Sequence, residues 1–405
     1  MRVLLLNLYY PPDTSATAKM AEIVVQALAA VHEVTVVCGR PSYDPTERRL
    51  WKLWQEEQTA RVRVIRVGST DYPRTQMKKR VLNYLSYVLL AVPRALFVPC
   101  DVVLAMTDPP FEGIIGALVS VLKSKPYVYN IRDMYPDMAV GGAIVEPGLL
   151  ARVWEKLHRW ALRRAIRVVV LGEDMRNRIL KKNVSPERVM VIRDGTEING
   201  GAVTPTLDRD VIRAIRGDFR FVLLHAGNLG FYGAWHTLLA GARELQPDGV
   251  GLVFVGDGAQ RQQIERAATG MSNVRFLPFF SPAQIPSVLA AADAHLITVK
   301  RGLEGVVVPS KMYGILAAGK PIVAVAPEEC DVVSLGKAKG FALSADPDVP
   351  GQFVRRVREM AEDGALVSAM GRAGRAAAPE YERNGELRKL VDLVERAGGG
   401  SPNRK

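Results

Sequence analysis

The chain has 405 residues, of which 48% are hydrophobic and 24% are charged, so it is long and apolar enough to bury more than one core. This length excludes a single small module and favours two domains. The three cysteines, Cys38, Cys100 and Cys330, are odd in number and form no metal-type pair. This pattern argues against structural disulfides and zinc and predicts a reducing compartment, with the cytosol as the default.

Residues 1–198 alternate between short apolar runs and helical patterns, which predicts one wound α/β domain. The first run ends at Leu6, too early for a secretory leader, and is typical of a buried strand. The apolar stretch 81–98 is broken by Asn83, Pro93 and Arg94, so it does not predict a membrane span. The predicted strands are Val3–Leu8, Val34–Cys38, Val62–Val67, Val102–Met106, Tyr127–Ile131, Arg167–Leu171 and Val189–Ile192.

Residues 199–208 lose this periodicity and gain turn formers, which predicts a linker. A second α/β domain is predicted over 209–378, followed by a C-terminal helix at 379–397 and a disordered tail at 398–405. Continuous apolar strands favour parallel sheets, whose ligands collect at the carboxyl ends of the strands. The predicted strands are Arg220–His225, Gly251–Val255, Val274–Leu277, Ala294–Thr298, Pro321–Val325 and Gly340–Leu343.

The stretch 308–321 reads as a helix start followed by a buried strand. Pro309 and Ser310 stop the preceding segment, and Ser310 is expected to cap the helix, with Lys311 beside its free N–H groups. Gly319 is expected to close the helix. Such a helix start suits a diphosphate, although plain scaffolding explains the pattern equally well.

Two further groups follow strands of the second half. Gly256 and Gly258 would let the backbone approach a ligand, or would simply form a turn. Phe279 and Phe280 follow the next strand, where one ring is expected to meet a nucleobase and at least one to pack in the core.

Several motifs occur in an order that resembles the glycosyltransferase family 4 type of GT-B enzyme. In the second half they are His225–Gly230 (with Gly227 and Asn228), Phe254–Gly258, Asn273–Pro278, Ala291–Asp293, Pro309–Lys311 and Ala317–Pro321. In the first half, Tyr9–Pro12, Thr107–Pro110, Ile131–Asp137 and Val169–Met175 resemble the branch that builds bacterial surface polysaccharides. The resemblance spans nearly the whole chain.

This resemblance implies two Rossmann-like domains with parallel sheets facing a cleft. The C-terminal domain would hold a nucleoside diphosphate sugar and the N-terminal domain a lipid-linked or polysaccharide acceptor, with retention of configuration and no resident cofactor. Charge that develops on the leaving diphosphate must be stabilised by a metal or by cations. We expect Lys300, Arg301 and Lys311 to do this without a metal, although Lys300 and Arg301 could also form a solvated loop pair.

The chain departs from the family pattern at the donor site. Two glutamates usual in the family align with Val306 and Gly314, and the usual Arg and Lys after the first strand are replaced by Asn228 and a stretch without cations at 231–235. A non-catalytic binding or scaffold module is therefore one alternative. A GT-B nucleotide-sugar epimerase is another.

In the first half, Asp133 is the candidate for positioning or deprotonating the acceptor hydroxyl. A helix cap or a salt bridge to Arg132 would explain it as well. The carboxylate pairs at 208–210 and 346–348 are attributed to turn chemistry rather than to a metal site. His225 and His295 lie on strand patterns and are interpreted as core histidines.

The first half is also the basic half. Residues 1–198 carry 29 Lys and Arg against 20 Asp and Glu, which accounts for +9 of the formal net charge of +12. No nucleic-acid motif accompanies this charge. An anionic membrane surface is a possible partner, and a solvated helix face is the alternative. One predicted helix has a stripe of cations, Arg152, Lys156, Arg159, Arg163 and Arg167. Its other side shows Val153, Leu157, Trp160 and Ala161. A second basic group, Lys78, Lys79 and Arg80, precedes another apolar helix.

Overall fold

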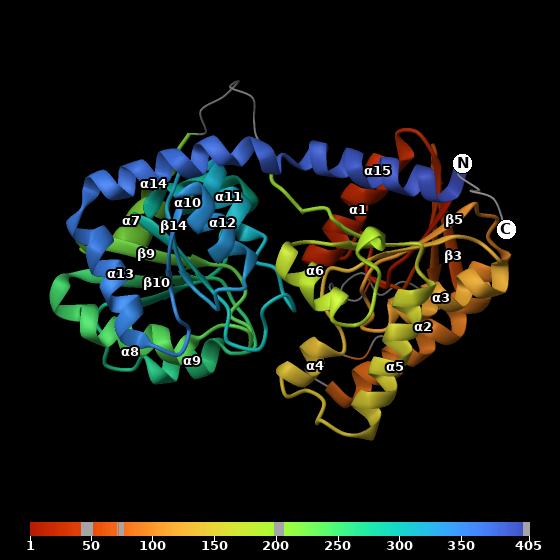
Figure 1. Ribbon diagram of the computed structural model, residues 1–405, viewed down its shortest axis with the longest axis horizontal. Helices are drawn as coiled ribbons and strands as arrows, with labels where there is room; N and C mark the ends of the chain where they lie inside the picture. Colours follow the sequence, from red (N-terminus) through yellow and green to blue (C-terminus); the bar gives the residue numbers. More distant parts are fainter. Residues whose placement is uncertain (42–51, 71, 73–76, 198–205, 400–405) are drawn as a thin grey trace. The chain divides into compact units, whose positions relative to one another are not determined.

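A computed structural model describes residues 1–41, 52–70, 72, 77–197 and 206–399 (Figure 1). The chain forms two compact units. Unit 1 comprises residues 1–171, 176–192 and 387–405, and unit 2 comprises residues 172–175 and 193–386. Residues 199–205 of the predicted linker, residues 400–405 of the predicted tail and the side chains of Lys78 and Arg80 lie outside the described residues.

Unit 1 contains an eight-stranded sheet in the order β3-β4-β2-β1-β5-β6-β7-β8. Its strands pair in parallel except for the edge strand β3, which forms an antiparallel hairpin with β4. The polar sequence of β3, WQEEQT, suits an exposed edge and explains why apolar periodicity missed this strand. The strands are β1 Arg2–Leu6, β2 Glu33–Cys38, β3 Trp54–Thr59, β4 Val62–Val67, β5 Val102–Ala105, β6 Tyr127–Asn130, β7 Arg167–Val170 and β8 Val189–Val191.

Helices cover both faces of this sheet. Helices α1 and α15 pack on one face, and α2, α3 and α5 form a layer on the other (Figure 1). Glycines let α3 approach the sheet, since a Cβ atom at Gly116 would lie 2.6 Å from the Ala105 Cβ. The helices are α1 Ala16–Ala29, α2 Met77–Phe97, α3 Glu112–Lys123, α4 Asp137–Gly141, α5 Leu149–Arg164, α6 Glu173–Leu180 and α15 Arg383–Gly399.

Unit 2 contains a six-stranded, fully parallel sheet in the order β11-β10-β9-β12-β13-β14. Its strands are β9 Phe221–Ala226, β10 Val250–Val255, β11 Val274–Leu277, β12 Ala294–Thr298, β13 Ile322–Val325 and β14 Ala342–Ala345. Its helices are α7 Arg209–Arg216, α8 Trp235–Leu245, α9 Arg261–Ala267, α10 Ile285–Ala291, α11 Lys311–Ala317, α12 Asp331–Lys339, α13 Pro350–Glu362 and α14 Gly364–Ala377. Parallel sheets in two α/β units were therefore predicted correctly.

Some local predictions were wrong. The strand predicted at 340–343 begins two residues later, because Gly340 adopts a left-handed φ of 74° and ends α12. Helix α5 ends at Arg164, so Arg167 lies on β7 instead of extending the basic stripe. Val153 and Leu157, placed on the side opposite the stripe, are both exposed. From here on, the basic stripe means Arg152, Lys156, Arg159 and Arg163.

The predicted C-terminal helix is present as α15, which begins at Arg383 and continues to Gly399. Its buried side chains Leu390, Leu393 and Val394 belong to the core of unit 1. The last helix of the chain thus completes the domain in which the chain begins. Within the described residues, no helix is long and apolar enough to cross a membrane.

Candidate active site

The sheet of unit 2 reverses its winding direction at β9. From β9 the chain proceeds outward through β10 and β11, and it then returns to the other side of β9 to form β12, β13 and β14. Ligands of open α/β sheets bind outside the carboxyl ends of the strands at such a switch point. The loops that follow β9, β10, β11 and β12 contain most of the donor-site residues predicted from the sequence.

The glycines after β9 and β10 hold two loops against each other. Gly227 and Gly256 adopt φ values of 143° and 138°, which other residues rarely tolerate. A Cβ atom at Gly256 would lie 2.1 Å from the Gly227 carbonyl oxygen, and one at Gly258 would lie 2.4 Å from Oδ1 of Asn228. Gly256 and Gly258 are therefore required for packing between the loops, a role that was not among those predicted, and their predicted approach to a ligand stays a prediction.

Gly227 differs from them because it faces open space. Apart from its neighbours in the chain, the one atom of the described residues within 4 Å of a Cβ atom at this position is the Lys311 Nζ, at 3.7 Å. The backbone at the end of β9 and the Lys311 ammonium thus border the same space. This is where a ligand at the switch point would meet both.

Lys311 is half-buried and has no carboxylate partner among the described residues. Its Nζ donates toward the buried ring of His225, with distances of 3.0 Å to Nδ1 and 3.1 Å to Nε2. Burial lowers the pKa of Lys311 to about 7. Burial and the nearby Lys311 likewise hold the pKa of His225 well below its ordinary value. An uncompensated cation of this kind favours binding of an anion.

The start of α11 differs in detail from the prediction. Ser310 occupies the N-cap position, but its side chain makes no capping hydrogen bond. Its backbone is already α-helical, with φ −60° and ψ −20°, whereas a capping serine has an extended backbone. Pro309 contributes its carbonyl oxygen to the first turn, which accepts from the Met312 N–H at 3.2 Å. Gly319 follows the helix with a left-handed φ of 66°, as predicted.

Lys300 and Arg301 follow β12 and have different surroundings. The Lys300 N–H donates to the Tyr232 carbonyl oxygen at 2.7 Å, and its Nζ lies 5.9 Å from the centre of the Phe231 ring. Arg301 pairs with Asp346 at 2.7 Å and Asp348 at 2.5 Å. These carboxylates, Asp348 foremost, raise the pKa of Arg301. Two carboxylates already balance the charge of Arg301. Lys300 and Lys311 are therefore better placed than Arg301 to bind an anion.

The two phenylalanines after β11 differ in burial, and the core packing expected of at least one of them is found for Phe280. Phe280 packs against the buried cluster under β9 and β10. Phe279 is 61% exposed, and its ring lies 3.2 Å from the Cβ position of Gly256. Phe279 therefore keeps an aromatic face accessible beside the glycine loops.

Asp133 lies in unit 1, three residues after β6. The sheet of unit 1 reverses between β1 and β5, and the loops after β1, β5 and β6 are joined there by hydrogen bonds. The Arg132 N–H donates to Thr107 Oγ1 at 2.7 Å, and the Asp108 N–H donates to Asn7 Oδ1 at 3.4 Å. Asp133 is therefore part of the loops at the switch point of this sheet.

Asp133 does not cap the helix that follows it. Helix α4 has Pro136 at its N-cap position. The carboxylate at the start of α4 is Asp137, which accepts from Arg178 at 2.9 Å and from Lys182 at 2.7 Å. Burial opposes ionisation of Asp137, but Lys182 and Arg178 outweigh it and lower its pKa. Asp137 thus has a structural role.

Sequence reasoning missed the contact between His225 and Lys311 and the contribution of Asn7 and Thr107. His225 is buried, as predicted, but no spacing in the chain indicated a lysine partner 86 residues away. Asn7 and Thr107 directly follow the apolar runs that form β1 and β5, and this position next to a strand end was the available signal. The turn chemistry expected of both aspartate pairs is present, since Asp208 caps α7 and the Asp348 N–H donates to Asp346 Oδ1 at 2.9 Å. The ion pairs of Asp346 and Asp348 with Arg301 were not predicted.

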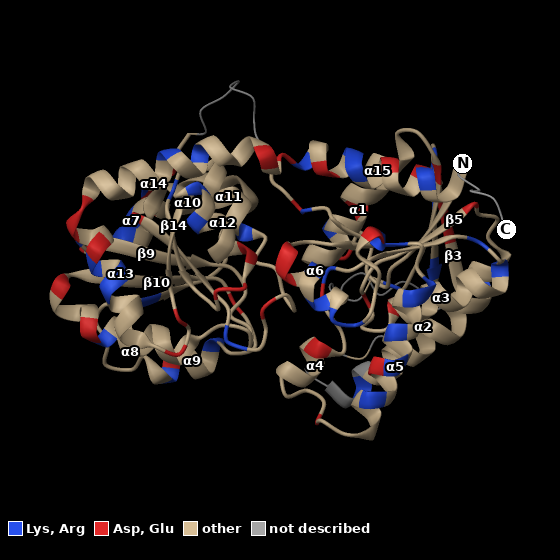
Figure 2. Ribbon diagram, in the orientation of Figure 1, with Lys and Arg blue, Asp and Glu red and all other residues tan. Residues whose placement is uncertain are grey.

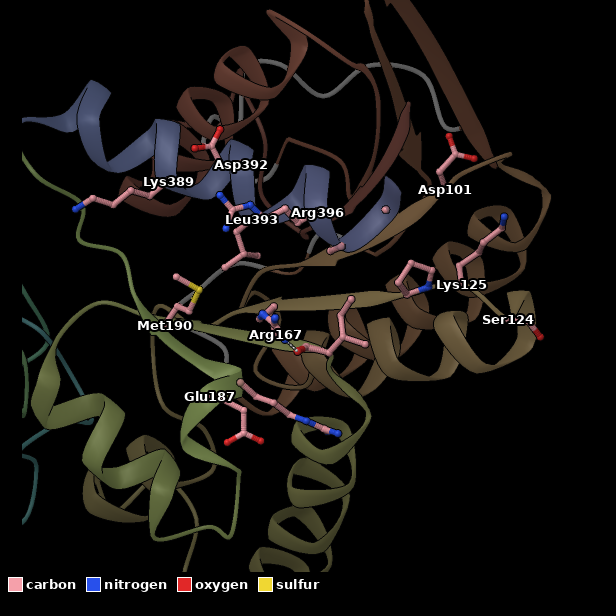
Figure 3. A pocket seen from close by; sticks show the side chains of 15 residues that line it. Asp101, Ser124, Lys125, Arg167, Glu187, Met190, Lys389, Asp392, Leu393 and Arg396 are labelled. Atoms are coloured by element: carbon pink, nitrogen blue, oxygen red, sulfur yellow. Dashed lines mark hydrogen bonds between the residues drawn. The ribbon is translucent and has the colours of Figure 1, made fainter. Parts of the chain in front are cut away.

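A separate pocket lies at the amino ends of β5 to β8, beside α15 (Figure 3). Arg167 and Met190 lie on its strand side, and Leu393 and Arg396 on its helix side. This is the edge of the sheet opposite to the one that carries Asp133, so the pocket is distinct from the candidate site. Among the described residues, no three His, Cys, Asp or Glu side chains are grouped so as to hold a metal ion.

Comparisons with known proteins agree with this arrangement. Residues 16–195 match the family described as "Glycosyl transferase 4-like domain", and residues 220–363 match "Glycosyl transferases group 1". The chain is 25% identical over 376 residues to the "Putative colanic acid biosynthesis glycosyl transferase WcaI" of Escherichia coli (strain K12), covering 89% of this chain and 92% of that protein.

Solved structures share the fold over the full length. HepE of Anabaena in complex with UDP-glucose superposes with a TM-score of 0.68 at 18% identity and covers 97% of this chain and 98% of its own. Sucrose-phosphate synthase from Thermosynechococcus elongatus superposes with a TM-score of 0.75 at 15% identity, covering 99% of this chain and 100% of its own. The chain therefore belongs to the glycosyltransferases of the GT-B fold, with a family 4-like N-terminal domain and a group 1 C-terminal domain.

Proposed function

We propose that this glycosyltransferase moves a sugar from a nucleoside diphosphate sugar, held by unit 2, to a saccharide or lipid-linked acceptor during assembly of a surface polysaccharide. The observation that carries the proposal is the position of the Lys311 amino group, which has no carboxylate partner among the described residues, beside Gly227 at the switch point of the sheet. The UDP-glucose bound to HepE, which has the same fold, supports a nucleotide-sugar donor. The name of WcaI, a colanic acid biosynthesis enzyme, supports the polysaccharide role.

Catalysis by this site requires stabilisation of the leaving diphosphate and orientation of the acceptor. Lys311 and Lys300 would balance the charge that develops on the diphosphate, without a metal ion. Arg301 would join them only by giving up its pairs with Asp346 and Asp348. Phe279 would stack on the base, and the backbone at Gly227 and Asn228 would allow close approach of the phosphates. Asp133 would position or deprotonate the acceptor hydroxyl in unit 1. The anomeric configuration would be retained.

The basic stripe of α5 would bring the enzyme to the acceptor by attraction to the anionic cytoplasmic face of the membrane. Arg152, Lys156 and Arg163 are exposed there, whereas Arg159 donates to Glu155 at 2.7 Å. Exposed cations near an anionic surface each contribute about 1 kcal/mol to binding.

Ligand binding tests the donor site. Full-length protein is titrated with UDP, GDP, ADP and dTDP and their sugars, and we expect a thermal shift with one base because ligand that binds only the folded state stabilises it. Lys311→Met should abolish the shift, whereas Lys337→Met, on the exposed surface of α12, should leave it unchanged. Transfer that persists in EDTA and gives a product of retained configuration by NMR supports the mechanism. Loss of activity in EDTA would contradict the metal-free route.

A non-catalytic binding module is the second candidate, and one observation favours it. Val306 replaces a usual glutamate and is completely buried, so this position offers no group to a ligand. Turnover decides between the two candidates. A protein that binds a nucleoside diphosphate sugar but neither transfers nor hydrolyses it, with lipid extracts and saccharides as acceptors, would be such a module.

A further inference from the structure

Helix α2 exposes an apolar row along its outer side. Val81, Leu85, Leu89 and Phe97 follow one another at multiples of four residues and expose 53%, 51%, 73% and 80% of their surface. Pro93 occupies the remaining position and is exposed as well. Residues four apart are neighbours on a helix but are offset by about 40° around it, so this series winds across the helix surface. Because all five positions are exposed, the side chains form one apolar row across the side of α2 that lies away from its buried residues Tyr87, Ala91 and Ala95.

The neighbouring helices extend this row into a surface. Helix α3 packs between α2 and α5 in the layer that covers one face of the sheet (Figure 1). Its exposed positions are apolar, and α5 exposes a group of apolar side chains beside the cations of the basic stripe. The exposed apolar side chains are Leu118, Val121 and Leu122 on α3 and Leu149, Leu150, Val153 and Leu157 on α5. We call the outer side of α2, α3 and α5 the apolar face.

This concentration is particular to unit 1. Among the described residues of unit 2, the exposed large apolar side chains are four, Leu207, Phe279, Ile285 and Val349, whereas the apolar row of α2 alone has as many. Contiguous exposed apolar surface in a folded protein marks a site of interaction with a protein or a membrane.

The charge around the apolar face is positive. Lys79 of α2 and Arg152 and Lys156 of α5 are exposed. The acidic residues within the bounds of the three helices are Glu112, which is buried, and Glu155, which is ion-paired. Figure 2 shows the layer as mostly uncharged with basic patches. The described part of these helices thus offers no exposed carboxylate.

We infer that the apolar face inserts into the headgroup and acyl boundary of an anionic lipid bilayer, with the neighbouring cations bound to lipid phosphates. Helices with an apolar side and flanking cations bind membranes in this way. The inference rests on the proposed function for its purpose, which is to hold the enzyme at a lipid-linked acceptor. It adds apolar insertion to the electrostatic attraction of the basic stripe.

A bilayer fits this face better than a second copy of the chain. In a two-fold symmetric dimer the same patch meets itself, so the cations beside it would be brought together, and the described part of the three helices offers no exposed carboxylate to balance them. Anionic headgroups supply the missing negative charge.

Site-specific labelling tests insertion directly. The three native cysteines are all buried, so a new surface thiol can be labelled selectively with an environment-sensitive dye. Leu89→Cys and Leu122→Cys place the dye on the apolar face, and Val31→Cys, at an exposed position after α1, is the control. On vesicles of phosphatidylcholine with phosphatidylglycerol, we expect a blue shift for the first two and none for Val31→Cys. Equal spectra at all three positions would overturn the inference.

A matched set of variants separates insertion from charge. The triple variant Leu89→Gln, Leu122→Gln, Leu157→Gln should lower the vesicle partition coefficient about tenfold or more, even at high salt, because apolar burial is not screened. The basic-stripe variant Arg152→Gln, Lys156→Gln should lose binding mainly at low salt. Val31→Gln, Val349→Gln should bind as the unmodified protein does. Unchanged binding of the triple variant would overturn insertion.

Two further measurements complete the test. If the unmodified protein is a dimer without lipid and the triple variant is a monomer, a second copy of the chain covers the apolar face. This result would overturn the inference. Nucleoside diphosphate binding is measured without lipid and should be the same in all these variants. Vesicle binding without nucleotide binding would contradict the proposed function alone, and nucleotide binding without vesicle binding would contradict the inference alone.

Discussion

Lys311 makes nucleotide binding dependent on pH. Burial lowers its pKa from 10.5 to about 7, so above pH 7 the unliganded site holds a neutral amine, whereas a bound diphosphate favours the ammonium. Binding should therefore take up a proton between about pH 7 and 10.5, and affinity should fall as the pH rises through this range. Titration calorimetry in two buffers of different ionisation enthalpy measures this uptake. Equal heats in both buffers would contradict it.

The same shift predicts a stability cost. The folded protein disfavours the charged form of Lys311, so the cost is largest below pH 7 and disappears as the pH rises toward 10.5. Lys311→Met should therefore raise the melting temperature most at and below pH 7, with a smaller gain at higher pH. A gain independent of pH would point to packing with His225 instead.

Substitution of Asp133 tests the role proposed for it at the acceptor site. Because α4 has Pro136 at its N-cap position, Asp133 is not the N-cap residue of that helix, and a salt bridge to Arg132 is the explanation that competes with catalysis. Asp133→Asn should lower turnover by orders of magnitude and leave donor affinity nearly unchanged. Kinetics with the correct acceptor check this, and near-normal turnover would remove Asp133 from the catalytic residues.

Asp137→Asn is the matched control for that experiment. It leaves Lys182 and Arg178 without their shared carboxylate, so we expect a loss of about 2 kcal/mol of stability with little change in turnover of the folded enzyme. The pKa of Asp137 is lowered in the fold. The stabilisation it provides is therefore present above its unfolded pKa and is lost as the pH falls through the folded pKa. Urea unfolding at neutral and acidic pH measures it.

At the scale of helices and strands, two glycines predict opposite effects of the same substitution. A Cβ atom at Gly116 of α3 would lie 2.6 Å from the Ala105 Cβ and 2.7 Å from the Tyr127 ring, whereas at Gly314 of α11 it would have no atom within 4 Å. Gly116→Ala should cost about 1–3 kcal/mol through overpacking. Gly314→Ala should add about 0.5–1 kcal/mol because alanine favours the helix. Denaturant midpoints compare the two, and equal effects would contradict the packing of α3.

The elements found from the sequence are those whose identity depends on local pattern. Apolar runs located the buried strands of both sheets, because a strand covered on both faces is apolar throughout. β3 was missed because its polar sequence carries no such signal and its position depends on pairing with β4. The Ser310 cap was wrong because capping depends on backbone angles, which residue type does not determine.

The candidate site was predictable to a similar extent. Glycines at strand ends and Lys311 were located from their motifs, because strand ends mark where a parallel sheet binds ligands. The ion pairs of Arg301 with Asp346 and Asp348 and the contact of Lys311 with His225 were not predictable, because each joins segments far apart in the chain. Such contacts depend on the order of strands in the sheet, which one sequence does not reveal.

At the scale of the whole molecule, the end of the chain supports the domain in which the chain begins. Val394 of α15 is completely buried in the core of unit 1, together with Leu390 and Leu393. Removing buried methyl groups leaves a cavity, so Val394→Ala should destabilise unit 1 by about 2 kcal/mol. Arg388→Ala, on the exposed side of the same helix, should have little effect.

Calorimetry can assign this loss to one unit, because chains with two domains need not unfold in a single transition. A nucleoside diphosphate that binds unit 2 should raise the transition of that unit by mass action. Val394→Ala should lower the transition that the nucleotide does not raise, since its contacts lie in the core of unit 1. If Val394→Ala lowered only the nucleotide-sensitive transition, α15 would instead stabilise the donor domain. A single transition moved by both changes would mean that the two units unfold together.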